Sequence, residues 1–385
     1  MRLLIAADIF PPVSGGPATY AVTLANALKK EGTEVRIVTL TPDADTDMVS
    51  VPVESVEPRR KFWKYVQYTR LVYKHAKLSD CIYAMGPVNA GFPAWIVSIL
   101  LGKPLAVKVV GDYAWEQGAE RFGVNDGIDA FQKKRGYGFF VEMLRMIEQW
   151  VVRRADRVIV PSDYLKTIVR GWGARPDRIT LIYNAIDIMS AEEIVKPEGE
   201  QWIVSVGRLA RWKGMQTLIE LMPHILSQFP RAQLKIVGDG PQYDALEDRI
   251  EALHLSDSVQ LLGDLPRSET LSYIQSADVF VLNSGYEGLS HTLLEAISFH
   301  TPILASTAGG NTELIVPGKN GELFPYNDAD RIREHILARL SAPSSAYDGN
   351  GVVLTDEEKK FFEQFQLATM ITRTKRILEQ VCEHS

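Results

Sequence analysis

The feature of this 385-residue chain that most restricts its fold is a repeated alternation of short apolar runs with longer helical segments. In the first half the strand-like runs are RLLIAAD, EVRIVTL, DCIYAMG, PLAVKVVGD, DRVIVPS and RITLIYN. Strands that are apolar on both faces are typical of parallel sheets covered by helices on each side. The alternation restarts after Asn184 with WIVSVGR, QLKIVGDG, SVQLLGD, DVFVLNS and PILASTAGG. Two such series predict two tandem Rossmann-like, doubly wound α/β domains that face each other across a cleft.

The domain boundaries follow from the segments between and after these series. The segment MSAEEIVKPEGEQ is polar and contains Pro197 and Gly199, so we interpret it as a linker. The stretch from Asp356 to Val381 has helical spacing and no strand after it, and we expect it to pack back on the first domain. We therefore predict an N-terminal domain of residues 1–184 plus 364–385 and a C-terminal domain of residues 185–363.

Cysteine use and hydropathy bear on the compartment. The two cysteines, Cys81 and Cys382, lie in very different contexts, and we expect no disulfide and a reducing cytosol. The opening MRLLIAADIF is interrupted by Asp8 and reads better as a strand than as a signal peptide. No uninterrupted apolar run reaches the roughly 18 residues of a membrane span. These observations predict a cytoplasmic protein.

The net charge of −6 is unevenly distributed. Residues 1–185 carry a net charge of +6 and residues 186–385 a net charge of −12. A basic first half suggests that this domain meets an anionic partner. Because the whole chain is acidic, nucleic acid is an unsuitable partner.

Two cations follow the first strand of the second series, in VSVGRLARWKGMQTLIELM. Arg208 stands at the strand end and Lys213 at the start of the next helix. Ligands of doubly wound folds bind outside the carboxyl ends of strands. Two cations and a helix N-terminus could hold a diphosphate there without a metal. The alternative is a pair of loop charges in water.

Two carboxylates, Glu287 and Glu295, stand in the mostly apolar run YEGLSHTLLEA. Glu287 falls in a loop at the end of the strand DVFVLNS, and Gly288, Leu289 and Ser290 offer backbone N–H groups at the start of the following helix. Glu295 lies about 6 Å further along that helix, within reach of the hydroxyls of a ribose. The alternative places Glu295 at a solvated helix edge.

The order of these motifs resembles the retaining glycosyltransferases of family 4 (glycosyl transferases group 1), which adopt the two-domain GT-B fold. Their glutamate pair, separated by seven residues, matches Glu287 and Glu295. Similar motifs are IFPPVSGGPATYAVTLANAL, RRADRVIVPSDYLK, YNAIDI, VGRLARWKG, VGDGP and TAGGNTELI. The resemblance covers nearly the whole chain. It implies transfer of a hexosyl unit from a nucleotide-diphosphate sugar with retention of anomeric configuration, and no cofactor or obligatory metal.

The resemblance also assigns residue roles. It makes the C-terminal domain the donor domain and the N-terminal domain the acceptor domain. Arg208 and Lys213 would grip the diphosphate, Glu287 the donor sugar and Glu295 the ribose, while the loop from Gly263 to Pro266 would meet the base. The full donor-binding set is Gly15, Gly16, Arg208, Lys213, Gly238, Leu265, Glu287, Gly288, Leu289, Ser290 and Glu295.

The chain departs from the family pattern at two positions. Where many relatives carry a histidine near the transferred sugar, this chain has Gly111, Asp112 and Tyr113. We expect Asp112 to replace that histidine, which gives a catalytic set of Glu287, Asp112, Arg208 and Lys213. His300 stands where relatives usually have glycine, a change that we expect to affect local packing.

Basic and aromatic residues gather at residues 58–77 and 133–140 of the first domain. Such surfaces suit an anionic membrane or a polyprenyl-linked pyrophosphate acceptor. The alternative is a helix whose Phe62, Val66, Thr69 and Tyr73 form a buried stripe while its lysines face water.

We therefore expect a cytoplasmic enzyme, with peripheral contact at the inner face of the cell membrane, that extends a glycan or lipid-linked acceptor in cell-surface polysaccharide or glycolipid synthesis. The alternatives are a glycosyltransferase for a small soluble acceptor, a nucleotide-sugar 2-epimerase and an inactive sugar-nucleotide-binding partner.

Overall fold

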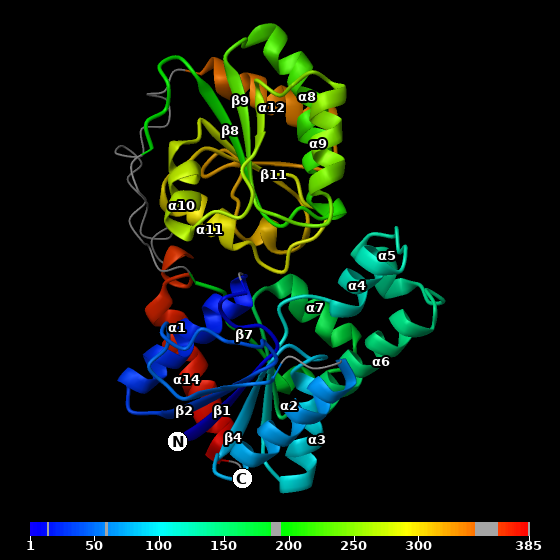
Figure 1. Ribbon diagram of the computed structural model, residues 1–385, viewed down its shortest axis with the longest axis vertical. Coiled ribbons are helices and arrows are strands. Elements are labelled where there is room, and N and C mark those ends of the chain that lie inside the picture. The colour runs from blue at the N-terminus through cyan, green and yellow to red at the C-terminus, as the bar shows by residue number, and fades with distance from the viewer. Residues whose placement is uncertain (14, 58–60, 186–193, 343–360, 384–385) are drawn as a thin grey trace. The chain divides into compact units, whose positions relative to one another are not determined.

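The computed structural model describes residues 1–385 except 14, 58–60, 186–193, 343–360 and 384–385. The chain divides into two compact units (Figure 1). The first unit comprises Met1–Asn184 and Gln366–Ser385, and the second comprises Ala185–Phe365.

The first unit is built on a seven-stranded sheet in the order β3-β2-β1-β4-β5-β6-β7, in which all paired strands are parallel. The strands are β1 Arg2–Ala7, β2 Glu34–Thr39, β3 Val53–Ser55, β4 Cys81–Met85, β5 Leu105–Lys108, β6 Arg157–Val160 and β7 Ile179–Leu181. β1 and β4 are almost wholly buried, which explains their continuous apolar sequence. The edge strand β3 was not predicted, because three half-buried residues give no periodic signal.

Helices cover both faces of this sheet (Figure 1). On one face, α1 contacts β1 and β2 and also packs against α14, which contacts β4 and β5. On the other face, α2 contacts β1 and β2, and α3 packs on β4 and β5 between α2 and α6. The helices of the unit are α1 Gly16–Lys30, α2 Lys61–Ala76, α3 Gly91–Leu101, α4 Tyr113–Arg121, α5 Ile128–Lys133, α6 Phe139–Arg154, α7 Asp163–Gly171, the 3₁₀ turn η1 Pro176–Arg178, and α14 Leu367–Glu383.

The return of α14 overturns the prediction that the two cysteines are unrelated. Cys382, in the last turn of α14, forms a disulfide with Cys81, the first residue of β4. The two positions are 301 residues apart in sequence, and only the packing of α14 on the sheet brings them together. The expectation of no disulfide was therefore wrong, and the argument that drew a reducing compartment from it no longer stands.

The second unit repeats the architecture with a six-stranded parallel sheet in the order β10-β9-β8-β11-β12-β13. Its strands are β8 Gln201–Val206, β9 Ala232–Val237, β10 Val259–Leu261, β11 Val279–Leu282, β12 Ile303–Ser306 and β13 Glu322–Phe324. The short strand β13 was also not predicted from the sequence. Two parallel sheets with helices on both faces confirm the predicted doubly wound fold class.

The helices of the second unit are α8 Met215–Gln228, α9 Tyr243–Ala252, α10 Arg267–Ser276, α11 His291–Ser298, α12 Ala329–Ser341, and the 3₁₀ turns η2 Arg211–Lys213 and η3 Gly309–Glu313. In Figure 1, α8, α9 and α12 lie on one side of the sheet and α10 and α11 on the other. Leu218, Ile219, Met222 and Ile225 place the apolar stripe of α8 in the core, at the spacing expected of an amphipathic helix.

Candidate active site

The strand order of the second unit reverses between β8 and β11. At such a switch point the loops after the two strands diverge, and ligands of doubly wound folds bind in the opening. The loop after β8 contains Arg208 and Lys213, and the loop after β11 contains Glu287. The predicted donor residues of the two motifs therefore come together at the place where this fold binds ligands.

Glycines allow the loops at this edge to pack closely. A Cβ atom on Gly238, after β9, would lie 2.1 Å from the carbonyl oxygen of Gly207, after β8. A Cβ atom on Gly309, after β12, would lie 1.9 Å from the carbonyl oxygen of Glu287, which also accepts a hydrogen bond from the N–H of Gly310 at 3.0 Å. Gly238 thus has a steric role in shaping the predicted site, because no larger residue fits there.

The loop after β11 ends in a capped helix. Ser290 is the N-cap of α11, and its hydroxyl accepts a hydrogen bond from the N–H of Leu293 at 3.2 Å. The N–H of Gly285 donates to the carbonyl oxygen of Trp212 at 2.6 Å, which ties this loop to the one that carries Lys213. Gly288 and Leu289 lie between these fixed points, just before the positive end of the helix dipole.

Lys213 and Glu287 form an ion pair across the switch point. The Lys213 Nζ lies 2.5 Å from Glu287 Oε1, and the two side chains are 16% and 13% exposed. Arg208, the second predicted cation, is exposed and directly follows Gly207. A largely desolvated pair interacts more strongly than a surface pair, and it holds the ammonium group in a fixed place.

Glu295 is buried in α11 and paired with a residue that the sequence analysis missed. The Glu295 Oε1 lies 2.9 Å from the Arg267 guanidinium, and its side chain is only 8% exposed. Burial raises the pKa of the Glu295 carboxyl, and the charge of Arg267 opposes that rise. Arg267 begins α10, just after the loop Gly263–Pro266 that contains Leu265, and packing of α10 against α11 brings it to Glu295. No spacing along the chain signals this contact.

The remaining predicted residues lie in the first unit. Gly15 has φ 146° and is the N-cap of α1, which begins at Gly16 after the loop that follows β1. This backbone conformation requires glycine.

Asp112 is fully buried and is the N-cap of α4. Its Oδ1 accepts from Trp115 N–H at 2.8 Å and its Oδ2 from Gln132 Nε2 at 2.6 Å. Glu148, also fully buried, lies beside Asp112, and burial next to that carboxyl raises the pKa of Glu148 well above its usual range. The Glu148 Oε2 accepts a hydrogen bond from the Ala114 N–H at 3.4 Å. These contacts favour a positioning role for Asp112, and its contact with a sugar stays a prediction.

His300 adopts φ 56° at the turn after α11, in the left-handed region that favours glycine. A glycine at this position would adopt the same turn without strain. The change from the family's glycine therefore affects the turn after α11.

The first basic-aromatic segment does not bury the predicted stripe. Phe62 is 71% exposed and Tyr73 is 36% exposed, whereas Tyr68 and Val72 are fully buried against the sheet. The stripe proposed as the alternative interpretation is therefore wrong in Phe62 and Tyr73. Residues 58–60, which include Arg59 and Arg60, lie outside the described residues.

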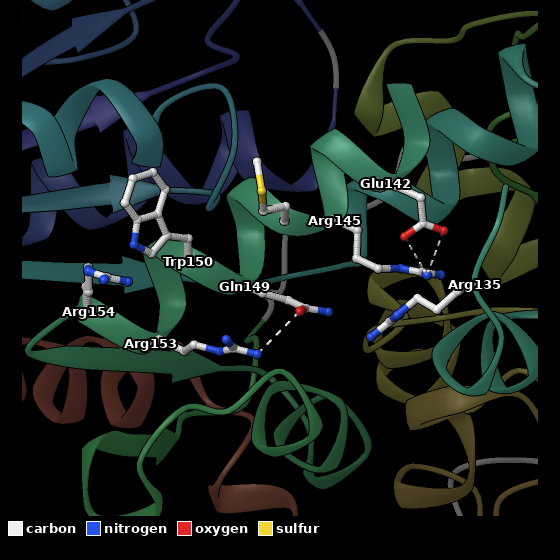
Figure 2. Close-up of a pocket in the computed structure, with 8 residues that line it drawn as sticks. Arg135, Glu142, Arg145, Gln149, Trp150, Arg153 and Arg154 are labelled. Atoms are coloured by element: carbon white, nitrogen blue, oxygen red, sulfur yellow. Dashed lines mark hydrogen bonds and ion pairs between the residues drawn. The ribbon is translucent and has the colours of Figure 1, made fainter. Parts of the chain in front are cut away.

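The second basic-aromatic segment leads into α6, along which a cavity of ≈ 520 Å³ opens (Figure 2). Arg145 is 3% exposed and pairs with Glu142 at 3.2 Å, and Arg154 stacks over Trp150 at 4.9 Å. The cavity is lined by Arg135, Glu142, Arg145, Met146, Gln149, Trp150, Arg153 and Arg154. Four arginines and one glutamate give this surface a positive charge.

The fold and the loops after its strands define a two-domain α/β protein with a cation–carboxylate site beside a helix start. Family models agree with this class: a glycosyl transferase 4-like domain matches residues 15–185, and the glycosyl transferases group 1 model matches residues 189–348. The chain therefore belongs to the group 1 glycosyltransferases.

Three known proteins illustrate the similarity. A glycosyltransferase assigned to colanic acid biosynthesis, WcaL of Salmonella typhimurium, is 27% identical over 60% of this chain and 59% of its own length. Alpha-monoglucosyldiacylglycerol synthase of Streptococcus pneumoniae is 24% identical over 89% of this chain and 79% of its own. The structure of Anabaena HepE with UDP-glucose has a TM-score of 0.76 at 19% identity and covers 99% of this chain and 100% of HepE. This last similarity concerns the fold, which is the GT-B arrangement of two Rossmann-like domains.

No helix within the described ranges has both the length and the apolar composition to cross a membrane.

Proposed function

We propose that this protein transfers a hexosyl unit from a nucleotide-diphosphate sugar to a glycan or lipid-linked acceptor, with retention of the anomeric configuration. The product belongs to cell-surface polysaccharide or glycolipid synthesis. The observation that carries the proposal is the desolvated Lys213–Glu287 pair at the switch point of the second unit, next to the start of α11. Family membership and the UDP-glucose bound by HepE support a nucleotide sugar as donor.

The proposed roles follow from charge and position. When the bond between the sugar's anomeric carbon and the diphosphate breaks, its electron pair stays on the diphosphate. Lys213 and Arg208 are placed to stabilise that growing negative charge. Glu287 holds Lys213 before the donor binds and is then available to accept a hydrogen bond from a donor-sugar hydroxyl. In this proposal the two cations supply the positive charge, so no metal ion or other cofactor is required.

Glu295 and Arg267 are assigned to the nucleoside. A carboxylate can accept hydrogen bonds from both ribose hydroxyls, provided that it is ionised. Arg267 favours the ionised form of a carboxyl whose burial disfavours it. Backbone groups complete the donor site, from Gly238, Leu265, Gly288, Leu289 and Ser290. In the first unit, Gly15 and Gly16 leave the start of α1 without side chains.

The first experiment measures thermal stabilisation of the full chain by UDP, GDP, ADP and dTDP and by their sugars, with EDTA present throughout. We expect the nucleotides of one base to raise the melting temperature of the wild type. Lys213→Ala should lose most of that rise, and its turnover of the matching nucleotide sugar should fall by orders of magnitude. The control is Lys319→Ala, which removes an exposed cation just before β13, at the amino ends of the strands of the same sheet. No shift from any nucleotide, or equal shifts in Lys213→Ala and wild type, would contradict the proposed donor site.

We also propose peripheral contact with an anionic membrane through the surface around α6. Phe139 is 76% exposed, Phe140 57% and Met146 59%. Phe139 and Phe140 begin α6, and Met146, further along the same helix, lines the arginine-rich cavity of Figure 2. Exposed aromatic residues next to arginines are the composition that binds anionic membrane surfaces.

Membrane contact is tested by sedimentation with vesicles of phosphatidylcholine alone or with 30% phosphatidylglycerol, a mole fraction of about one third chosen to give a clearly negative surface. We expect binding only to the anionic vesicles and its loss in a double variant, Arg135→Glu with Arg154→Glu. Equal sedimentation of that variant and wild type would exclude this surface.

A further inference from the structure

The first unit has a switch point of its own, between β1 and β4. Asp8 directly follows β1, and Asn89 lies in the loop after β4. By the rule that located the donor residues, a ligand of this unit is expected at the carboxyl ends of these two strands. Neither residue was singled out by motif, because no motif spans two loops that are 81 positions apart.

Asn89 connects three side chains at this point. Its Oδ1 accepts a hydrogen bond from the Tyr65 hydroxyl of α2 at 2.7 Å. Asn89 also lies close enough to the Asp8 carboxyl and to the hydroxyl of Tyr113, the first residue of α4, to oppose the rise that burial causes in the pKa of each. Its amide carries two N–H donors besides the oxygen that accepts from Tyr65. The amide therefore lies beside a carboxylate and two tyrosine hydroxyls.

The Asp8 carboxylate retains hydrogen-bonding capacity. Its Oδ1 accepts a hydrogen bond from the Ile9 N–H at 2.9 Å, and its own backbone N–H and the Asn89 side chain are close enough to oppose the rise in its pKa. A carboxylate offers about four acceptor positions, so these three neighbours leave room for one more donor. Asp8 and Asn89 are only partly buried, and Tyr65 is 39% exposed, so a solute can reach the group.

The desolvation of the Asp8 carboxyl favours a functional role for it over a purely structural one. Burial raises the pKa of Asp8 to about 6, so the ionised form is held at a cost in stability. An asparagine could also accept the hydrogen bond from the Ile9 N–H without that cost. Carboxyls that are perturbed in this way and lie where a fold binds ligands are candidates for function.

We propose that Asp8 and Asn89, together with the hydroxyls of Tyr65 and Tyr113, bind the sugar ring of the acceptor, with Asp8 accepting a hydrogen bond from an acceptor hydroxyl. This inference rests on the proposed glycosyl transfer and adds the chemical class of the acceptor group, a pyranose with neighbouring hydroxyls. A carboxylate, an amide and two phenol groups offer the mixture of acceptors and donors that sugar hydroxyls require.

The inference is tested by saturation-transfer NMR on the full chain with methyl glucoside, methyl galactoside and methyl mannoside. We expect at least one glycoside to receive saturation from the wild type, and the signal to fall at least about fivefold in Asp8→Asn, which keeps the size of the side chain. The control, Asp177→Asn, removes an exposed carboxylate just before β7, at the amino ends of the strands, and this variant should bind the glycoside as wild type does.

The pH gives a second readout that a merely structural Asp8 would not produce. The titratable groups that face Asp8 are Tyr65 and Tyr68 from α2 and Tyr113 from α4, and the pKa of each is raised above 10. The wild-type signal should therefore fall as the pH drops through about 6, and Asp8→Asn should show no such midpoint.

The outcomes separate this inference from the proposed function. No glycoside signal in the wild type, or equal signals in wild type and Asp8→Asn, would overturn the inference. Nucleotide stabilisation, measured on the same samples, reports the second unit and should be unchanged in Asp8→Asn. Its absence from the wild type would remove the proposed function, and the assignment of the sugar as an acceptor with it.

Discussion

Lys108 offers the most direct test of the electrostatics of the first unit. This last residue of β5 is 1% exposed, and its Nζ lies 3.5 Å from the centre of the Tyr20 ring. The amino group has no hydrogen-bond partner within the part of the chain that the structure describes. Desolvation lowers the pKa of Lys108 from 10.5 to about 7. We expect Lys108→Met, which keeps the length and removes the charge, to stabilise the protein.

The magnitude follows from linkage. An unfolded lysine stays protonated up to its ordinary pKa, whereas Lys108 in the folded chain loses its proton above about 7. Between these values the unfolded state binds more protons, so the free energy of unfolding rises with pH by about 1.4 kcal/mol per unit. At pH 8 the buried lysine therefore costs at most about 3 kcal/mol, and below pH 7 the cost levels off near about 5 kcal/mol.

The assay is urea unfolding at pH 6, 7, 8 and 9, followed by tryptophan fluorescence. We expect the gain in stability of Lys108→Met over wild type to shrink steadily from pH 7 to pH 9. Lys30→Met, which removes an exposed lysine at the end of α1, is the control and should show no such trend. A gain that does not change with pH, or a loss of stability at pH 6, would refute the reasoning.

Three further predictions concern other contacts. Cys382→Ser should lower the free energy of unfolding by about 2–5 kcal/mol because it removes a cross-link between residues 301 positions apart, and dithiothreitol should do the same to the wild type but not to the variant. Arg267→Ala should weaken nucleotide binding about tenfold at pH 7, since it removes the ion-pair partner of the buried Glu295 carboxylate. Calorimetry with the stabilising nucleotide would measure the change, and Arg267→Lys should recover part of the loss. Gly309→Ala should cost several kcal/mol, on the order of other strained backbone substitutions, because its Cβ would lie 1.9 Å from the Glu287 carbonyl oxygen; an unchanged melting temperature would show that the loop can move aside.

The sequence predicted the elements of the fold that carry a strong local signal. All eleven apolar runs read as strands form parallel strands, because a buried parallel strand must be apolar on both faces. The strands β3 and β13 were missed, since three residues are too few for a period and pairing with a longer neighbour fixes them. The helical pattern predicted from Asp356 to Val381 begins in residues 356–360, which lie outside the described residues, and its second half forms α14 from Leu367.

The candidate site was likewise predictable from the sequence only in part. Arg208, Lys213, Glu287 and Glu295 were predicted as site residues from the chain alone, because each stands at a fixed distance from a strand end or a helix start. Their partnership in space was not readable: the Lys213–Glu287 pair joins loops 74 positions apart.

Three relations depended on tertiary structure alone. Arg267 reaches Glu295 only because α10 and α11 pack together, and Asp8 meets Asn89 only because β1 and β4 are neighbours in the sheet. Cys81 meets Cys382 only because α14 returns to the first unit. Local periodicity and steric preference are properties of residues that are close in the chain, so they can be predicted from the sequence. Contacts between distant residues depend on strand order and helix packing, which many sequences with the same local pattern would arrange differently.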